Sequence, residues 1–147
     1  MARWPGAFLF PALGLGIWIL LLGLRAIDPR RAHYAKFEDA YWTVLNLMTL
    51  FFALQQAMIV AVGLGAPVDP ARFIPFAVGL LFALLGNWLP KIRSNWWMGI
   101  RTPWTLESDE VWRSTHRLAG WLFVVAGVAI MAASLVLPVG AVAWVIA

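Results

Sequence analysis

The sequence contains no cysteine among its 147 residues. This absence excludes a disulfide framework, a thiolate metal site and a cysteine nucleophile. Charged residues are also scarce, at 12% against about 25% in an ordinary soluble domain. Apolar residues reach 63%, and a soluble fold of that composition could not cover its surface with polar groups. The chain is therefore predicted to be an integral membrane protein.

The apolar residues form four stretches close to the length of about 20 residues that a membrane-spanning helix needs. These are residues 7–24, 41–64, 73–89 and 118–137, and none contains Asp, Glu, Lys, Arg or His. Without ionisable groups in the spans, a proton pump, a voltage sensor and an ion-coupled transporter are not expected. We predict an all-α polytopic protein with a single membrane domain over residues 1–147.

Neither end of the chain is expected to change the number of membrane spans. No small-x-small cleavage site follows the first stretch, so we expect a retained anchor and not a signal peptide. The apolar residues 138–147 should not form a fifth span, because ten helical residues reach only about 15 Å.

Lysine and arginine are distributed unevenly between the predicted loops. Nine of them lie in residues 25–40 and 90–117, and only Arg3 and Arg72 lie on the other side of the predicted membrane. Since Lys and Arg accumulate on the cytoplasmic side, both termini are predicted to face outward. The net charge of +4 then suggests contact with anionic lipid headgroups and not with nucleic acid.

The first loop has a helix signal. Asp28 can cap a helix and Pro29 suits its first position, and Tyr34, Phe37 and Tyr41 then share one face. We expect this helix to run directly into the second span. Arg30 is expected to be an ordinary surface charge.

Small and polar residues recur at helical spacing inside the spans. They are Asn46, Thr49, Ala53 and Gln56 in the second span, Gly79, Ala83 and Asn87 in the third, and Gly120, Gly127 and Ser134 in the fourth. Such residues let helices approach closely and hydrogen-bond to one another. Packing is one interpretation, and a solvated path or ligand pocket is the other.

The loop between the third and fourth spans carries the most information. Pro90 ends the third span, Gly99 permits a sharp turn, and Pro103 stiffens the chain after it. Thr105 or Ser108 can cap a helix with acidic residues in its first turn. We predict an interfacial amphipathic helix over residues 108–117, between helices 3 and 4, that can continue into the fourth span.

Within residues 86–123, the runs GIRTPWTL, EVW and THR resemble the signature of the SdpI family of bacterial integral membrane proteins. The resemblance extends weakly over residues 20–137. It implies a polytopic bacterial membrane protein, and in that family one member gives immunity to a secreted killing peptide and captures a transcriptional repressor. Compared with that member, this chain is expected to be a short form without the extra N-terminal membrane region.

The candidate ligand- or partner-binding site consists of polar and aromatic side chains of this loop that need groups to hydrogen-bond or pack with. They are Asn87, Asn95, Arg101, Trp104, Glu110, Arg113, His116 and Arg117. Residues 95–105 are expected to fold back on residues 108–117 and close a cytoplasmic pocket. Arg101 should pair with an acidic residue of 107–110 or with a bound anion.

Catalytic and metal chemistry find little support. His33 and His116 are not at metal-ligand spacing, and no nucleophile–base–orienter set is visible. We therefore predict no enzyme activity, no catalytic residues, no cofactor and no metal site.

The function expected is that of a non-enzymatic membrane protein of immunity or signalling type. It would bind a peptide toxin or a regulatory protein at the membrane, in contact with membrane lipids, and a homo-oligomer is a further option. The alternatives are a protein that binds or transports a lipid headgroup or small molecule through the basic loop, and a membrane enzyme acting at headgroup level.

Overall fold

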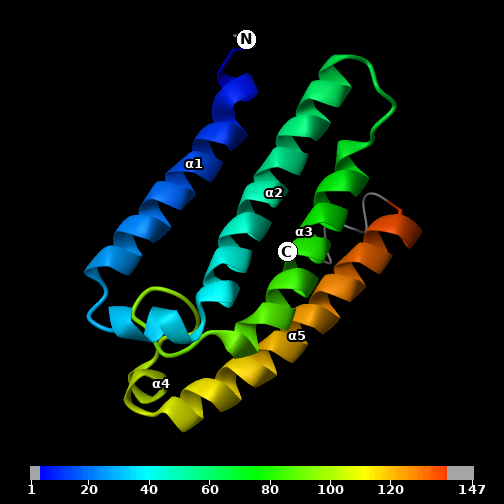
Figure 1. Cartoon of the computed structure of the whole chain (residues 1–147). Helices are drawn as coiled ribbons and strands as arrows, with labels where there is room; N and C mark the ends of the chain where they lie inside the picture. The colour runs from blue at the N-terminus through cyan, green and yellow to red at the C-terminus, as the bar shows by residue number, and fades with distance from the viewer. Residues whose placement is uncertain (1–3, 139–147) are drawn as a thin grey trace.

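The computed structural model describes residues 4–138, whose regular secondary structure is helical. The elements are α1 (Trp4–Ile27), η1 (Arg31–Lys36), α2 (Glu38–Gly63), α3 (Pro70–Trp88), η2 (Leu89–Lys91), α4 (Pro103–Glu107) and α5 (Asp109–Val136). Figure 1 shows the four long helices side by side in the order α1, α2, α3 and α5. All four are long and apolar enough to cross a membrane, so the prediction of four spans is confirmed.

One boundary differs from the sequence-based expectations. The first loop forms a separate 3₁₀ helix that ends at Lys36, so the continuous helix into the second span was wrong. Residues 109–117 are the first turns of α5, without a break before the fourth span. The expectation for the C-terminal tail falls on residues 139–147, outside the described range.

Glycines bring α3 and α5 into backbone contact. A Cβ added to Gly86 would lie 2.6 Å from the carbonyl oxygen of Gly120, and one on Gly120 would lie 2.6 Å from that of Gly86. Gly79 and Gly127 form a second reciprocal pair seven residues along each helix. Because a side chain at any of these positions would separate the helices, the packing interpretation holds for these glycines.

A polar contact also joins α3 and α5 at the end away from the long loops. Arg72, in the first turn of α3, donates to the carbonyl oxygens of Ser134 and Leu135 at 3.2 and 3.0 Å. These carbonyls belong to the last turn of α5, which has no further helical N–H groups to bond. The side chain therefore fixes the register of the two helices.

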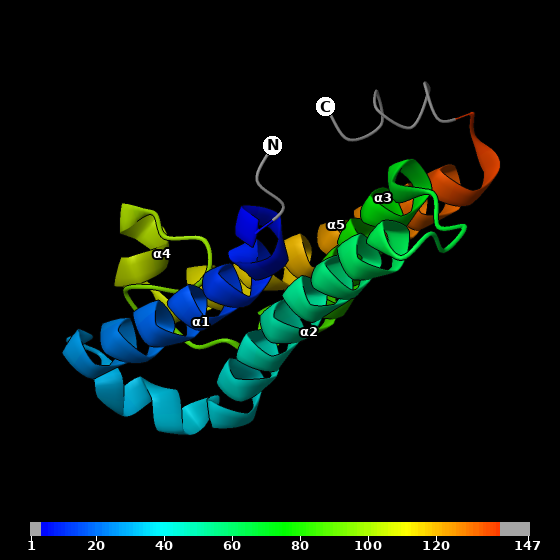
Figure 2. The same ribbon diagram turned by 90° about the horizontal axis from the view of Figure 1, so that it is seen from above.

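The contact between α1 and α2 includes a charged and aromatic cluster near the first loop. The Arg25 guanidinium lies over the rings of Tyr41 and Trp42, at 5.0 and 5.7 Å from their centroids, and pairs with Glu38 at 3.0 Å. Further along, Trp18 Nε1 donates to Thr49 Oγ1 at 2.5 Å. The two helices also meet farther along, where the rings of Phe10 and Phe52 stack with centroids 6.1 Å apart, and they run as neighbouring ribbons in Figures 1 and 2.

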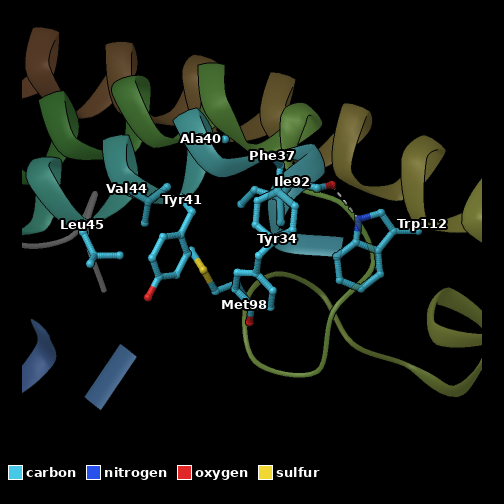
Figure 3. Close-up of a cluster of buried hydrophobic side chains, with 9 residues drawn as sticks. All are labelled: Tyr34, Phe37, Ala40, Tyr41, Val44, Leu45, Ile92, Met98 and Trp112. Atoms are coloured by element: carbon cyan, nitrogen blue, oxygen red, sulfur yellow. Dashed lines mark hydrogen bonds between the residues drawn. The ribbon is translucent and has the colours of Figure 1, made fainter. Parts of the chain in front are cut away.

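The first and third loops meet at one end of the helices, which we call the basic end (residues 28–37 and 89–108). A cluster of buried apolar side chains lies there, drawn in Figure 3. It comprises Tyr34, Phe37, Ala40, Tyr41, Val44, Leu45, Ile92, Met98 and Trp112. The predicted aromatic face of Tyr34, Phe37 and Tyr41 is therefore confirmed as buried.

Candidate functional site

Asp28 connects the two loops of the basic end. Its carboxylate is only 2% exposed, and it accepts hydrogen bonds from the backbone N–H of Arg30 at 2.7 Å, the Tyr34 hydroxyl at 2.9 Å and the backbone N–H of Trp96 at 3.1 Å. Burial, and next the hydrogen bond to Asp28, raise the pKa of Tyr34 above its usual range. Asp28 thus binds a group 68 residues away in the chain, a role beyond the helix cap expected from sequence.

Arg30 provides a second connection. Its guanidinium donates to Ser94 Oγ and, at 2.7 Å, to the carbonyl oxygen of Leu106. The ring of His33 donates through Nδ1 to the carbonyl oxygen of Ser94 at 2.8 Å. The expectation that Arg30 is an ordinary surface charge was wrong, because it contacts two segments of the third loop.

Asn95 organises the turn that follows. It is fully buried, its Oδ1 accepts from the backbone N–H groups of Trp97 and Met98, and its Nδ2 donates to the carbonyl oxygens of Arg93 and Met98. With donors and acceptors of the amide both used inside the loop, the structure gives Asn95 a structural role.

His116 attaches this loop to α5. Its ring is buried and stacks on Trp112 with centroids 4.1 Å apart. Nδ1 donates to the carbonyl oxygen of Trp112 at 2.9 Å, and Nε2 accepts from the backbone N–H of Ile100 at 3.0 Å. This pattern requires the neutral ring protonated at Nδ1. Gly99 has φ +100°, and a Cβ there would collide with His116 Nε2.

Trp112 and Thr105 complete the fold of the loop. Trp112 Nε1 donates to the carbonyl oxygen of Ile92 at 2.8 Å, the dashed line in Figure 3. Thr105 and Thr102 cap α4 reciprocally. The expected cap of α5 is Ser108, whose hydroxyl accepts from the backbone N–H of Val111 at 3.3 Å.

The loop therefore folds back on the start of α5, as predicted, but the eight candidate residues are not gathered in one pocket. Asn95 and His116 are interior, whereas the other six are exposed: Asn87, Arg101, Trp104, Glu110, Arg113 and Arg117. Arg101 donates to the carbonyl oxygen of Trp96 at 2.5 Å. Among the described residues the ion pairs are Arg25–Glu38 and Arg72–Asp69, so an internal pair of Arg101 with 107–110 was wrong.

An open groove of about 990 Å³ lies between α1 and α2. Its lining is mainly apolar and comprises Phe10, Pro11, Gly14, Leu15, Trp18, Thr49, Phe52, Ala53, Gln56, Ala57, Val60, Ala61 and Leu64. Thr49 is already bonded to Trp18 and to the carbonyl oxygen of Leu45. The side-chain amide oxygen Oε1 of Gln56 is buried without a hydrogen-bond partner among the described residues.

Sequence reasoning placed Thr49, Ala53 and Gln56 on one helical face but could not find the groove. Their common face was visible from the spacing of three, four and seven residues. Whether a groove runs along this face depends on how α1 packs against α2. The spacing of residues within α2 does not report that packing.

Comparison with known proteins connects the chain to one family. The model of the SdpI/YfhL protein family matches residues 91–147. The chain is 33% identical over 82 residues to a protein of Bacillus subtilis (strain 168) named immunity protein SdpI. That alignment covers 56% of this chain and 39% of the relative, so the chain spans well under half of the relative's length. No solved structure matches.

Proposed function

Because the chain belongs to the SdpI/YfhL family of multi-pass membrane proteins, we propose that it is a non-enzymatic immunity-type protein that binds an apolar peptide within the bacterial membrane. The peptide lies in the groove between α1 and α2. The relative named as an immunity protein supports an immunity-type function. The groove supports the position of the peptide between α1 and α2.

The groove itself carries the proposal. Its volume of about 990 Å³ lies at the upper end of the range of about 300–1,000 Å³ for ligand sites. Ala53, Ala57 and Ala61 form a stripe of small residues along α2, facing Gly14 on α1. Such stripes let a third helix approach its neighbours closely in lipid.

The unpartnered oxygen of Gln56 favours a peptide over an acyl chain. A buried acceptor without a donor costs about 1–3 kcal/mol. A hydrocarbon tail has no donor to offer, whereas a peptide helix can supply a hydroxyl or amide N–H. The bound peptide is therefore apolar, with a small-residue face and one polar donor.

The test is protection of a sensitive bacterium by the expressed chain against the secreted killing peptides of the chain's own host. Wild type should protect, and Ala57→Phe, which fills the groove, should abolish protection. Ala129→Phe is the matched control, because Ala129 is exposed on α5 outside the groove. The proposal fails if wild type gives no protection, or if Ala57→Phe protects as well as the control at equal expression.

A further inference from the structure

A second cavity lies at the basic end, away from the α1–α2 groove. Its volume is about 420 Å³, and η1, the third loop and the start of α5 all contribute to it. The lining that matters is His33, Lys36, Arg93, Ser94, Asp109 and Arg113. We propose that this cavity binds a phosphate-bearing ligand, held by Lys36, Arg93 and Arg113 together.

The first argument is the charge of the lining. Lys36, Arg93 and Arg113 are three cations, and Asp109 is the one carboxylate among the lining residues. In the part of the chain described, neither ion pair includes any of these four residues. Three like charges around one cavity repel each other, and an anion between them removes that repulsion.

The second argument is that the cavity is built on fixed positions. Arg93 lies between Ile92 and Ser94, which are 3% and 2% exposed. Arg113 follows the buried Trp112, and Lys36 precedes the buried Phe37. The three charged side chains are exposed, but each starts from backbone next to buried residues, which favours a preorganised site.

His33 adds a directional group. Its Nδ1 donates to the carbonyl oxygen of Ser94, so the ring is fixed and Nε2 remains for the cavity that His33 lines. Guanidinium forks at Arg93 and Arg113 suit the tetrahedral oxygens of a phosphate.

Asp109 adds a requirement on the ligand beyond negative charge. A carboxylate in the same cavity repels a bare phosphate but accepts a hydrogen bond from a hydroxyl or an ammonium group. The ligand class that fits all of these groups is a phosphate ester or diester with a hydroxyl or amino substituent. Both a glycerophospholipid headgroup and a free phosphate ester have this chemistry.

The experiment measures binding to the purified full-length chain in nanodiscs of phosphatidylcholine. One arm adds glycerol 3-phosphate or inorganic phosphate to the solution, and the other adds phosphatidylglycerol to the bilayer. Arg93→Gln should weaken binding about tenfold or more, equivalent to about 1.4 kcal/mol. Lys36→Gln should do the same, as a second variant at an independent position.

Arg31→Gln is the matched control. Arg31 is an exposed arginine of η1 outside the cavity, and its replacement removes the same charge. It should change the affinity for the phosphate less than twofold, because Arg31 acts on the ligand only by long-range attraction and not by contact in the cavity. Binding in the soluble arm identifies a free phosphate ester, and binding in the bilayer arm alone identifies a lipid headgroup.

Two results overturn the proposal. One is an absence of binding in both arms. The other is an equal loss of affinity in Arg31→Gln and Arg93→Gln, which would indicate unspecific attraction by the basic end. Unfolding without phosphate should show Arg93→Gln at least as stable as wild type, because the repulsion is relieved. The proposal is independent of peptide binding, and Ala57→Phe should leave phosphate affinity unchanged.

Discussion

The α3–α5 pair and the α1–α2 pair are built from similarly apolar helices but pack in opposite ways. In α3–α5, two reciprocal glycine pairs bring the backbones together. In α1–α2, an aromatic and ionic contact around Arg25 holds one end, and the rings of Phe10 and Phe52 stack farther along. A groove of about 990 Å³ remains between these two helices. In lipid there is no hydrophobic force between helices, so close packing of small residues decides which pairs stay together.

The two helix pairs therefore have different roles. The α3–α5 pair, with its ends fixed by Arg72 and by the third loop, is a rigid support for the basic end. The α1–α2 pair retains a row of small residues along the groove, Ala53, Ala57 and Ala61, which is the surface that a third helix would need.

The largest expected effect is that of Gly127→Ala. A Cβ at Gly127 would overlap the Gly79 carbonyl oxygen and the backbone of Ala83, so the helices must separate. We expect a loss of about 3 kcal/mol, the upper end for overpacking, measured by thermal unfolding in nanodiscs. Gly16→Ala is the control, since nothing lies within 4 Å of a Cβ there. Equal stability of both variants would show that the glycine contact is not needed.

Asp28→Asn should have the next largest effect. The amide loses one acceptor oxygen and turns a donor either toward the Arg30 N–H or toward the Tyr34 hydroxyl and the Trp96 N–H, which all donate to Asp28. The expected cost is about 2 kcal/mol, within the range for unsatisfied buried groups. Asp39→Asn, at an exposed position on α2, should cost less than about 0.5 kcal/mol. Hydrogen exchange at the Trp96 amide should rise in the first variant and stay unchanged in the second.

Arg30→Ala and Arg101→Ala make a smaller comparison at the basic end. Arg30 joins Ser94 and Leu106, whereas Arg101 is exposed and contacts only the nearby Trp96 carbonyl among the described residues. We expect Arg30→Ala to cost about 1–2 kcal/mol and Arg101→Ala about 0.5 kcal/mol. The midpoints of thermal unfolding compare the two, and the reverse order would contradict the assignment of Arg30.

Thr49→Val should have the smallest effect. It removes the acceptor of the Trp18 hydrogen bond, and hydrogen bonds between helices in membranes average about 0.6 kcal/mol. Thr43→Val, on the same helix, is the control, because no hydrogen bond of its side chain is present in the described structure. Trp18 fluorescence should shift in the first variant alone, and an unchanged spectrum would place the indole N–H on another acceptor.

Sequence reasoning recovered the parts of the structure that depend on local pattern. Charge-free stretches located the four spans, and the spacing of Gly120 and Gly127 identified a packing face. The stop at Pro90, the turn at Gly99 and the cap at Ser108 were also visible, since each acts through its own backbone geometry.

The parts that failed depend on contacts between distant segments. Arg30 looked like a surface charge because its acceptors at Ser94 and Leu106 lie more than sixty residues away. Arg101 was given an acidic partner because charges of opposite sign were near in sequence, yet its own loop turns it toward Trp96. Residues 31–36 form a 3₁₀ helix. Phe37 ends this helix, and α2 begins at the next residue, Glu38.

The hydrogen bond from Trp96 to Asp28 also orders the events of synthesis. The two residues are 68 apart, and at about 5–20 residues per second the second leaves the ribosome about 3–14 s after the first. During that interval α1 and α2 must enter the bilayer while Asp28 and Arg30 lack their native partners. The basic end therefore closes only after α3 has emerged, so the first hairpin of the protein is placed in the membrane before the loop that holds it exists.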